Sequence, residues 1–530
     1  MTVTAGTVTE RLLARVGEGH HGLRFGEACW TWHEQVRECA MHAALLRELR
    51  DGRRPFHVGV LADNIPAFSF LLGAAALAGA VLVGLNPTRR GAALARDVRA
   101  ADCQLVITER AHRELLTGLD LGAATGRVFD VDSAKWAAML AAHRAAPVDP
   151  VPAREDDLLM LIFTSGTGGD PKPVRCTHGK IAQPGAMLAE RFNLSTTDTV
   201  YVAMPLFHSN AIMAGWSVAL ASGATIALRR KFSASRFLDD VRTYGATYAN
   251  YVGTPLSYIL AVPERADDAD NPLRVVYGNE GAPADLAAFA DRFGCSVIDG
   301  YGSTEGGVAI SRTPDTPAGA LGRLPDGVDI LHPDTGSPCP PARFGAGGGL
   351  ANPSQAIGEL VNTAGTGMFA GYYNAEDAEA ERVRGGMYFT GDLAYRDAAG
   401  FCYFAGRTGD WLRVGGENLG TAPIERALSR YPGISDVAVY GVPDGHVGDA
   451  VTAAIVPCGA PFDPMGFAAF LAAQGDLGPV QYPRYLRLMH QLPRTATHKV
   501  VKRELAAQGL DCADPVYERA SDDPPRYAAR

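Results

Sequence analysis

The stretch LLMLIFTSGTGGDPKPV, from Leu158 to Val174, decides how the rest of the chain is interpreted. It begins with an apolar run, Leu158 to Phe163, which is too short for a good helix and has no polar alternation, so it predicts a strand buried on both faces. The composition then changes abruptly to hydroxyl residues and glycines, starting at Thr164 and ending at Lys172. Glycines let backbone N–H groups turn toward an anion, hydroxyls add donors, and lysine supplies a compact positive charge. The stretch therefore predicts a strand followed by a phosphate-binding loop.

This loop is not of the Walker type, which requires the pattern G-x-x-x-x-G-K-[ST]. A loop rich in Gly, Ser and Thr is often only a linker, but a preceding buried strand and a following Pro-Lys pair favour phosphate binding here. The residues expected to bind the phosphates are Thr164, Ser165, Gly166, Thr167 and Lys172.

The composition is that of a soluble globular protein with more than one domain. A chain of 530 residues is too long for one ordinary core. Its hydrophobic content of 47% is ample for a core, and its charged content of 20% is that of a soluble globular protein. A formal net charge of −9 without any basic run argues against nucleic-acid binding. Nine scattered cysteines without a C-x-x-C pair favour a reduced, cytoplasmic protein over a disulfide framework or a zinc site. The N-terminus lacks a cleavable signal pattern.

One uncharged stretch, Ile65 to Leu85, is long enough to span a bilayer. However, it is rich in alanine, and Gly73, Gly79 and Gly84 interrupt it. We therefore expect a buried helix that packs through small residues, followed by a short buried strand, and no transmembrane segment.

The order of elements predicts an α/β fold. Short apolar strands separated by helical segments before and after the phosphate loop imply βαβ units and largely parallel sheets. A shift to Pro and Gly near Thr313 predicts a small antiparallel β subdomain that continues to Gly406. The tail has its own helix and strands. We expect a large N-terminal domain over residues 1–408 and a small, mobile α+β domain over residues 409–530.

Further segments along the chain carry polar residues in glycine- and proline-rich contexts. They are PLFHSN (205–210), GNEGAP (278–283), DGYGSTEG (299–306), YFTGD (388–392), GRTGD (406–410), GGEN to PIE (415–425) and LPRTATHKVVKREL (492–505). In this order and at these spacings, together with the loop, they resemble the adenylate-forming superfamily of acyl-CoA synthetases, peptide-synthetase adenylation domains and luciferases. The resemblance is strongest to long-chain and very-long-chain fatty-acyl-CoA synthetases, and it extends over more than half of the chain.

The resemblance implies roles for the first of these motifs. His208 would line the acyl pocket, although a histidine after an apolar strand is by itself more often a satisfied core residue. Thr304 would contact phosphate, and Glu305 would hold Mg²⁺ together with Thr164. This fits the preference of Mg²⁺ for one or two carboxylates plus phosphate oxygens, whereas the alternative is a surface glutamate in a glycine-rich turn. The residues expected around the adenine are Gly281, Ala282, Pro283, Tyr301, Gly302 and Ser303.

Three residues of the later motifs complete the implied site. Asp392 would accept hydrogen bonds from both ribose hydroxyls, because a carboxylate has two acceptor oxygens, and Arg407 would be a second ribose contact. Lys499 would be the catalytic lysine that bridges the acid and the ATP α-phosphate and stabilises the negative charge during attack.

The resemblance implies an enzyme that works in two steps with ATP, Mg²⁺ and coenzyme A. A carboxylic acid, expected to be a fatty acid, attacks the α-phosphorus of ATP to give an acyl-adenylate and pyrophosphate. The C-terminal domain then rotates, and a thiol attacks the acyl carbon. Coenzyme A is the expected thiol, because no carrier domain follows. Relatives commonly form homodimers, but no segment of the sequence indicates an interface.

Three alternatives stay open at this stage. Some relatives activate aryl acids, and diazotase-like members activate nitrite for an aromatic amine; the ATP motifs would look the same in both. A non-catalytic nucleotide-binding protein is disfavoured, because a chain freed from catalysis would tolerate losing site residues, and here they are all present. Substitutions of usual family residues by Gly168, Pro173, His498 and Gly409 leave the groups needed for adenylation in place.

Overall fold

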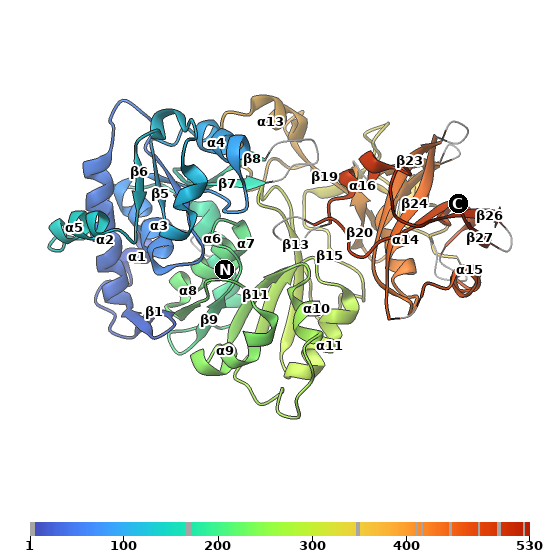
Figure 1. Ribbon diagram of the computed structural model, residues 1–530, viewed down its shortest axis with the longest axis horizontal. Helices are drawn as coiled ribbons and strands as arrows, with labels where there is room; N and C mark the ends of the chain where they lie inside the picture. The colour runs from blue at the N-terminus through green and yellow to red at the C-terminus, as the bar shows by residue number, and fades with distance from the viewer. Residues whose placement is uncertain are drawn as a thin grey trace. The chain divides into compact units, whose positions relative to one another are not determined.

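The computed structural model describes residues 6–164, 171–345, 350–408, 411–414, 417–444, 448–459, 461–474, 477–494, 500–522 and 525–530. The chain divides into two compact units (Figure 1). The first comprises Met1–Gly306 and Met368–Glu381, and the second comprises Gly307–Gly367 and Arg382–Arg530. The domain boundary expected after residue 408 lies inside the second unit and stays a prediction.

The first sheet of the first unit has the order β6-β5-β3-β4-β7-β8. Its strands pair in parallel, except that β7 and β8 form an antiparallel hairpin. The apolar run expected as a strand is β7, and its four residues from Leu159 to Ile162 are completely buried. The strands are β3 (His57–Leu61), β4 (Val81–Gly84), β5 (Leu105–Thr108), β6 (Val128–Asp130), β7 (Leu158–Thr164) and β8 (Lys172–Thr177).

The second sheet of this unit runs β13-β12-β11-β9-β10-β1-β2. It is parallel apart from the antiparallel pair β1 and β2, so the predicted parallel-sheet architecture is confirmed. The strands are β1 (His21–Phe25), β2 (Ala28–Thr31), β9 (Thr199–Val202), β10 (Thr225–Leu228), β11 (Tyr248–Val252), β12 (Val275–Asn279) and β13 (Ser296–Gly302).

Helices connect these strands, as βαβ units require (Figure 1). Ser209 starts a helix that passes through a π-helical turn, Ile212–Trp216, into α8. The helices are α1 (Val8–Leu13), α2 (Trp32–Leu49), α3 (Pro66–Ala78), α4 (Gly91–Ala100), α5 (Ala134–Ala142), α6 (His178–Arg191), α7 (Ser209–Ala211), α8 (Ser217–Ser222), α9 (Phe237–Tyr244), α10 (Pro255–Leu260), α11 (Pro283–Phe293) and α13 (Glu376–Arg382), with 3₁₀ turns at Arg110–Leu116, Gly122–Ala124 and Ala234–Arg236.

The uncharged stretch after residue 65 forms the expected buried helix and strand. Helix α3 is buried along nearly its whole length and ends at Gly79, whose φ of 67° lies in the left-handed region that glycine adopts easily. The chain then enters β4 at Val81. Among the described residues, no helix is long and apolar enough to cross a membrane.

The second unit contains an antiparallel sheet and a mixed sheet. The antiparallel sheet, β15-β20-β19-β17-β16, is the β subdomain expected from the Pro- and Gly-rich stretch. The elements are β14 (Ala309–Ser311), β15 (Gly322–Arg323), β16 (Val328–Leu331), α12 (Pro353–Ala356), β17 (Gly358–Asn362), β18 (Val383–Arg384), β19 (Met387–Arg396) and β20 (Phe401–Arg407).

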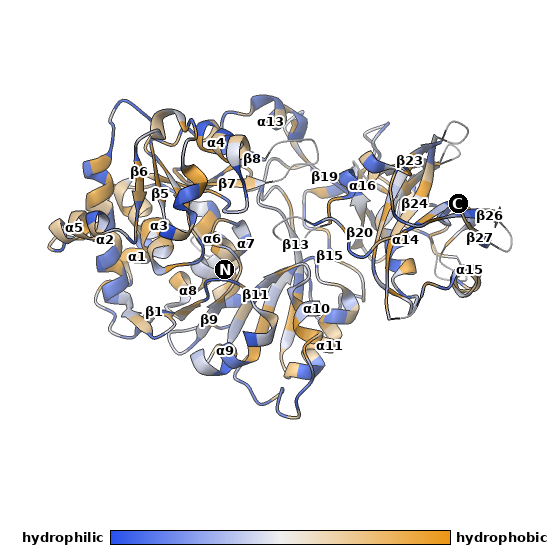
Figure 2. Cartoon of the chain, viewed as in Figure 1, coloured by the Kyte–Doolittle hydropathy of each residue, from blue (hydrophilic) through white to orange (hydrophobic). Residues whose placement is uncertain are grey.

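The mixed sheet contains the long hairpin of β23 and β24, beside which β25 lies parallel to β24. Its apolar core includes Ile424, Val439, Ile455 and Phe467. Figure 2 shows the hydrophobic residues of this hairpin in orange. The elements are β21 (Trp411–Val414), β22 (Glu417–Gly420), α14 (Thr421–Leu428), β23 (Ile434–Asp444), β24 (Gly448–Pro457), α15 (Pro464–Ala472), a 3₁₀ turn (Pro479–Gln481), β25 (Tyr485–Leu488), α16 (Lys502–Gln508), β26 (Val516–Asp522) and β27 (Pro525–Ala529).

The parallel sheets position the candidate site. In parallel α/β sheets, ligands bind outside the carboxyl ends of the strands. Thr164 ends β7, Asn279 ends β12 and Gly302 ends β13, so three of the sequence motifs include the carboxyl end of a strand of the first unit.

Candidate functional site

A carboxylate at the end of β13 is the centre of the candidate site in the first unit. Oε1 of Glu305 accepts hydrogen bonds from the Thr164 hydroxyl at 3.2 Å and from the Tyr372 hydroxyl at 3.0 Å. No residue in the described part of the chain donates a hydrogen bond to its other oxygen, Oε2. The structure thus brings the two predicted metal-binding residues together, and a carboxylate with a hydroxyl beside it is the kind of oxygen donor set that Mg²⁺ takes.

The hydroxyl of Thr304 is held from the other side of the same segment. Its Oγ1 lies 2.7 Å from Oγ of Ser209, the first residue of α7. Ser209 directly follows His208, so this bond joins the segment carrying Glu305 to the segment carrying His208.

The His208 ring lies in an apolar environment. Its centroid is 4.4 Å from that of Phe207, and Nε2 is buried with no hydrogen-bond partner among the described residues. Burial lowers the pKa of His208 from 6.5 to about 4, so the ring is neutral near pH 7. His208 is therefore not a satisfied core histidine, since it keeps an unused polar atom.

The GNEGAP segment forms the turn between β12 and α11. The Gly281 N–H donates to Oδ1 of Asp299 at 3.1 Å, and the Tyr251 hydroxyl donates to the same oxygen at 2.5 Å. A Cβ at position 281 would stand 2.9 Å from the Tyr251 hydroxyl, so the close approach of this tyrosine requires glycine. Ala282 is the N-cap and Pro283 the first residue of α11.

Lys172, the first residue of β8, lies where the phosphate loop ends. Its Nζ is 3.7 Å from a carboxylate oxygen of Glu381 and 5.9 Å from the ring centroid of Tyr372. Tyr301 and Gly302 are the last residues of β13, and Ser303 is exposed just beyond them. The position of the Lys172 ammonium group thus brings it near Tyr372, the residue that bonds Glu305.

In the second unit, the two predicted ribose-binding residues are paired with each other. Asp392 on β19 and Arg407 on β20 are cross-strand neighbours, and Nε of Arg407 lies 3.4 Å from Oδ1 of Asp392. Both side chains are largely covered, at 13% and 31% exposure. Four further predicted residues lie outside the described residues: Ser165, Gly166, Thr167 and Lys499.

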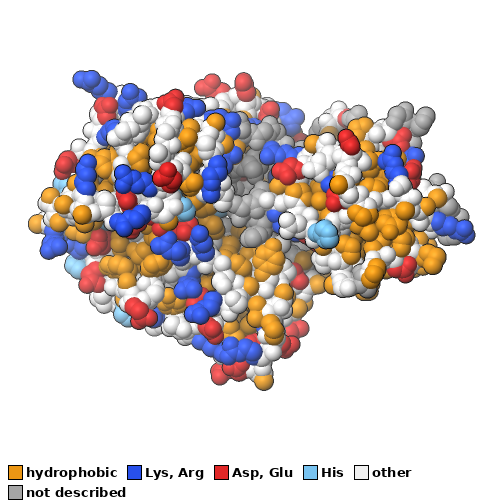
Figure 3. Space-filling view, in the orientation of Figure 1, with side chains coloured by type: hydrophobic (Ala, Val, Ile, Leu, Met, Phe, Trp, Pro, Cys, Tyr) orange, Lys and Arg blue, Asp and Glu red, His pale blue; other side chains and the backbone are white. Residues whose placement is uncertain are grey.

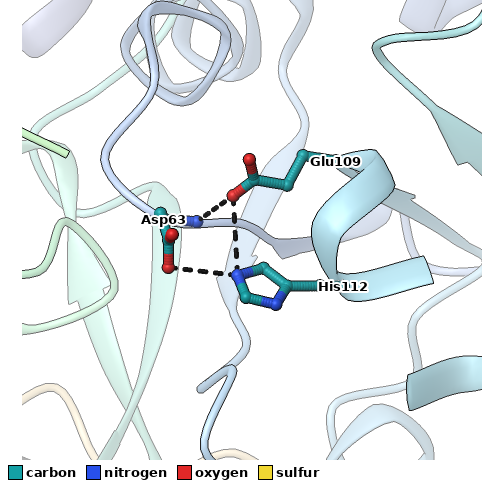
Figure 4. Close-up of side chains that lie close together, drawn as sticks. All are labelled: Asp63, Glu109 and His112. Carbon is teal, nitrogen blue, oxygen red and sulfur yellow. Dashed lines mark hydrogen bonds and ion pairs between the residues drawn. The ribbon is translucent and has the colours of Figure 1, made fainter. Parts of the chain in front are cut away.

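A second group of polar side chains lies at the ends of β3 and β5 (Figure 4). Nε2 of His112 is 3.0 Å from Oδ1 of Asp63 and 3.5 Å from Oε1 of Glu109. The ligand atoms of these three residues, two carboxylate oxygens and one imidazole nitrogen, can hold a metal ion. However, Arg230 lies 2.6 Å from Glu109, and Lys231 lies 3.3 Å from Asp63. The cluster already has its counter-charges, so we interpret it as an ion-pair network.

Comparison with protein families identifies the chain. A model of AMP-binding enzymes matches residues 14–373, and a model of the AMP-binding enzyme C-terminal domain matches residues 423–499. The chain belongs to the AMP-binding enzyme family. The resemblance to the adenylate-forming superfamily is confirmed, and with it the class of AMP-forming ligase.

Relatives similar over almost their whole length include CoA ligases. The chain is 57% identical to a medium/long-chain-fatty-acid–CoA ligase of Mycobacterium marinum, covering 96% of this chain and 98% of the relative. It is 47% identical to a steroid-22-oyl-CoA synthetase of Rhodococcus jostii, covering 98% of this chain and 94% of the relative.

Solved structures confirm the predicted fold. ATP-bound MatB from Rhodopseudomonas palustris matches with a TM-score of 0.81 at 22% identity, covering 96% of this chain and 99% of that chain. An anthranilate CoA ligase in complex with anthranoyl-AMP also matches with a TM-score of 0.81, at 20% identity, covering 95% and 97% of the two chains. At these identities the likeness shows the fold alone.

Sequence reasoning missed several residues that shape the site. Tyr372, which bonds Glu305, and Ser209, which bonds Thr304, carry no local signal, because both contacts join segments far apart in the chain. Asp299 is the first residue of the DGYGSTEG motif, but the sequence analysis assigned it no role in the site. Trp216 is fully buried and donates a hydrogen bond to Ser69, and the Tyr251 hydroxyl donates one to Asp299.

Proposed function

We propose that this protein activates a medium- or long-chain fatty acid with ATP and transfers the acyl group to coenzyme A. The observation that carries the proposal is 57% identity over almost the full length to a ligase named for this reaction. The Glu305, Thr164 and Tyr372 contacts support it, because they supply the expected donors beside the phosphate loop.

The proposed reaction has two steps that balance. An oxygen of the carboxylate attacks the α-phosphorus of ATP, forming an acyl-adenylate as the bond to the β-phosphate oxygen breaks and pyrophosphate leaves. The thiol sulfur of coenzyme A then attacks the acyl carbon, giving the thioester, AMP and one proton. The net reaction is acid, ATP and coenzyme A to acyl-CoA, AMP and pyrophosphate.

Glu305 and Thr164 are the residues that would hold Mg²⁺, which neutralises phosphate charge when bound. Oε2 of Glu305 would be the carboxylate oxygen that binds the ion. Tyr372 would keep Oε1 fixed, so that the carboxylate presents one defined oxygen. Lys172 and the Thr304 hydroxyl would donate hydrogen bonds to phosphate oxygens. Lys172 would first leave its ion pair with Glu381.

His208 would contact the acid as a neutral ring. Because its pKa is about 4, it cannot act as a cationic partner for the carboxylate near pH 7. It can supply one hydrogen bond from the unused Nε2 and an apolar surface. Lys499 would then be the cation that approaches the acid, as the sequence motif predicts.

Residues of several motifs would bind the adenosine. Residues Gly281 to Pro283 and Tyr301 would lie along the adenine. In the second unit, Asp392 would accept hydrogen bonds from the ribose hydroxyls, with Arg407 holding its carboxylate. A cytoplasmic location and a homodimer stay predictions.

Pyrophosphate release with Mg-ATP, measured across a panel of acids with and without coenzyme A, tests the proposal. The panel contains medium- and long-chain fatty acids, a steroid-22-oic acid, an aryl acid, and nitrite with an aromatic amine. Release that depends on a fatty acid, with acyl-CoA as product, is the expected result. Release with nitrite alone, insensitive to coenzyme A, would overturn the proposal, although the comparisons do not favour that activity.

A steroid acid is the second candidate substrate, because the relative at 47% identity is a steroid-22-oyl-CoA synthetase. The same panel separates the two. A ratio of kcat/KM that favours the steroid acid over every fatty acid would replace the first candidate with the second while keeping the same chemistry.

A further inference from the structure

A buried lysine that the proposed mechanism does not use lies directly behind Glu305. Lys180 is in the first turn of α6, which Thr177 caps, and only 3% of it is exposed. Taking an ammonium group out of water is costly unless hydrogen bonds or opposite charges compensate it. Burial accordingly lowers the pKa of Lys180 from its ordinary value. A buried lysine at this position needs a reason.

The ammonium group of Lys180 joins two segments of the candidate site. It donates to the carbonyl oxygen of Glu305 at 2.8 Å and to the carbonyl oxygen of Arg175 at 3.2 Å. Arg175 lies in β8, the strand that follows the phosphate loop, whereas Glu305 follows β13 in the other sheet. No carboxylate of the described residues lies within ion-pair distance of Nζ, and both of these hydrogen-bond partners are backbone carbonyls.

The backbone beside Glu305 is shaped to admit this lysine. Gly306 has a φ of +74°, and a Cβ there would stand 3.3 Å from Cε of Lys180 and 3.2 Å from Cβ of Met368. The Met368 N–H in turn donates to the Gly306 carbonyl at 3.0 Å. Glycine thus serves two needs here, a left-handed backbone and close packing against the lysine stem.

We propose that Lys180 is a positioning residue for Glu305, fixing the main chain from which the proposed metal-binding carboxylate extends. This proposal rests on the proposed function, since it takes Glu305 as the magnesium ligand. The Thr164 and Tyr372 hydroxyls hold the tip of the side chain, and Lys180 holds its base. Hydrogen bonds from a charged donor are stronger than neutral ones, so an ammonium group holds the carbonyl more firmly than an amide would. A metal-binding side chain that is held at its tip and at its base needs little reorganisation when the ion binds.

Two variants at this position and one control elsewhere separate the donor from the space that it fills. Lys180→Met keeps the length and removes every donor, Lys180→Gln keeps a neutral donor, and Lys135→Met makes the same change at an exposed residue of α5 as the control. Two readouts are needed. Calorimetric titration of ATP at increasing Mg²⁺ concentrations gives the affinity, and pyrophosphate release gives kcat and the KM of ATP and of the acid.

We expect Lys180→Met to raise the Mg²⁺ concentration for half-maximal ATP binding about fivefold to tenfold, and to lower kcat of adenylation about tenfold, as loss of charge-assisted hydrogen bonds predicts. The KM of the acid stays within about twofold, because Lys180 touches no group assigned to the acid. Lys180→Gln recovers part of both losses, and Lys135→Met behaves like the parent protein.

The proposal is overturned if Lys180→Met lowers the melting temperature but leaves the Mg²⁺ requirement and kcat unchanged, since Lys180 would then be only structural. Where Lys180→Met does not fold, Lys180→Gln decides by the same readouts. Failure of the proposed function has a different signature. The parent protein would release no pyrophosphate with any acid, while the Mg²⁺ dependence of ATP binding would still report on Lys180.

Discussion

Tyr372 donates its hydroxyl to the same Glu305 oxygen that Thr164 contacts, and the next residue offers a matched control. Removing one hydrogen bond to a carboxylate, with a net value of about 1.5 kcal/mol, predicts that Tyr372→Phe lowers kcat/KM for ATP about tenfold. Tyr373→Phe removes a hydroxyl that bonds Asp102 at 2.9 Å instead, so it should leave kcat/KM unchanged. Equal effects of both substitutions in the pyrophosphate assay would contradict the assignment of Tyr372.

Glu305 itself should matter far more than the residues that hold it. Glu305→Gln keeps the size of the side chain but removes the negative charge proposed to bind Mg²⁺. We expect kcat/KM for ATP to fall by about a hundredfold or more, with a higher Mg²⁺ requirement. The control is Glu190→Gln, at an exposed position of α6. A Glu305→Gln enzyme with the parental Mg²⁺ dependence would remove the metal-binding role.

Lys499 stays a prediction of the sequence motif. If it bridges the acid and the α-phosphate, Lys499→Ala lowers the rate of acyl-adenylate formation by about a hundredfold or more. Single-turnover formation of acyl-adenylate without coenzyme A measures this step directly. Unchanged adenylate formation would take the catalytic role away from this lysine.

At the scale of elements, the cluster of Asp63, Glu109 and His112 (Figure 4) is joined through Arg230 to the other sheet of the first unit. Glu109 follows β5, and it contacts the N–H of Asp63 after β3, at 2.6 Å, and Arg230 after β10, also at 2.6 Å. Its carboxylate is 3% exposed, so its charge is buried among its partners.

We expect Glu109→Gln to destabilise the first unit by about 1–3 kcal/mol, because the glutamine can still accept the Asp63 N–H but leaves Arg230 only the more distant carboxylate of Asp63, at 3.5 Å. Chemical denaturation measures the loss. Glu114→Gln, an exposed change in the 3₁₀ turn that follows Glu109, should cost nothing measurable. If the two variants are equally stable, the network contributes no stability.

At the scale of the molecule, buried histidines should make stability depend on pH. Burial lowers the pKa of His42, His178 and His208 from 6.5 to about 4 in each case. Between these values the unfolded chain binds more protons than the folded one, so the free energy of unfolding falls as the pH decreases from about 6.5 to about 4. Above pH 6.5 these histidines are neutral in the folded and the unfolded chain, so they no longer lower the free energy of unfolding.

Denaturation midpoints at pH 7.5 and pH 5.0 test this expectation. Each histidine contributes at most about 1.4 kcal/mol per pH unit within this window. His178→Gln should therefore reduce the difference between the two pH values, whereas His490→Gln, at an exposed residue, should not. A difference that His178→Gln leaves intact would assign the pH dependence to other groups.

The visible face of the molecule shows acidic and basic side chains interspersed (Figure 3), as expected for a chain with a formal charge of −9 and no basic run. The charge pattern could be predicted because it depends only on composition and local order. The location of β7, the buried α3 and the antiparallel β subdomain could be predicted for the same reason. Apolar runs, and the glycines or prolines that interrupt them, determine the secondary structure of the few residues around them.

By itself, the sequence determined the α/β class, the family and the candidate residues, because these depend on local pattern and on the order of motifs. Only the tertiary structure decided which of them meet. Thr164 and Glu305 lie 141 positions apart, and Tyr372 lies 67 positions beyond Glu305. Such contacts depend on the order of strands in two sheets, which no local propensity encodes. The same holds for Lys180, which is 125 positions from the carbonyl it binds. A lysine in a helix is read from sequence as solvated, and only burial between two segments made it part of the site.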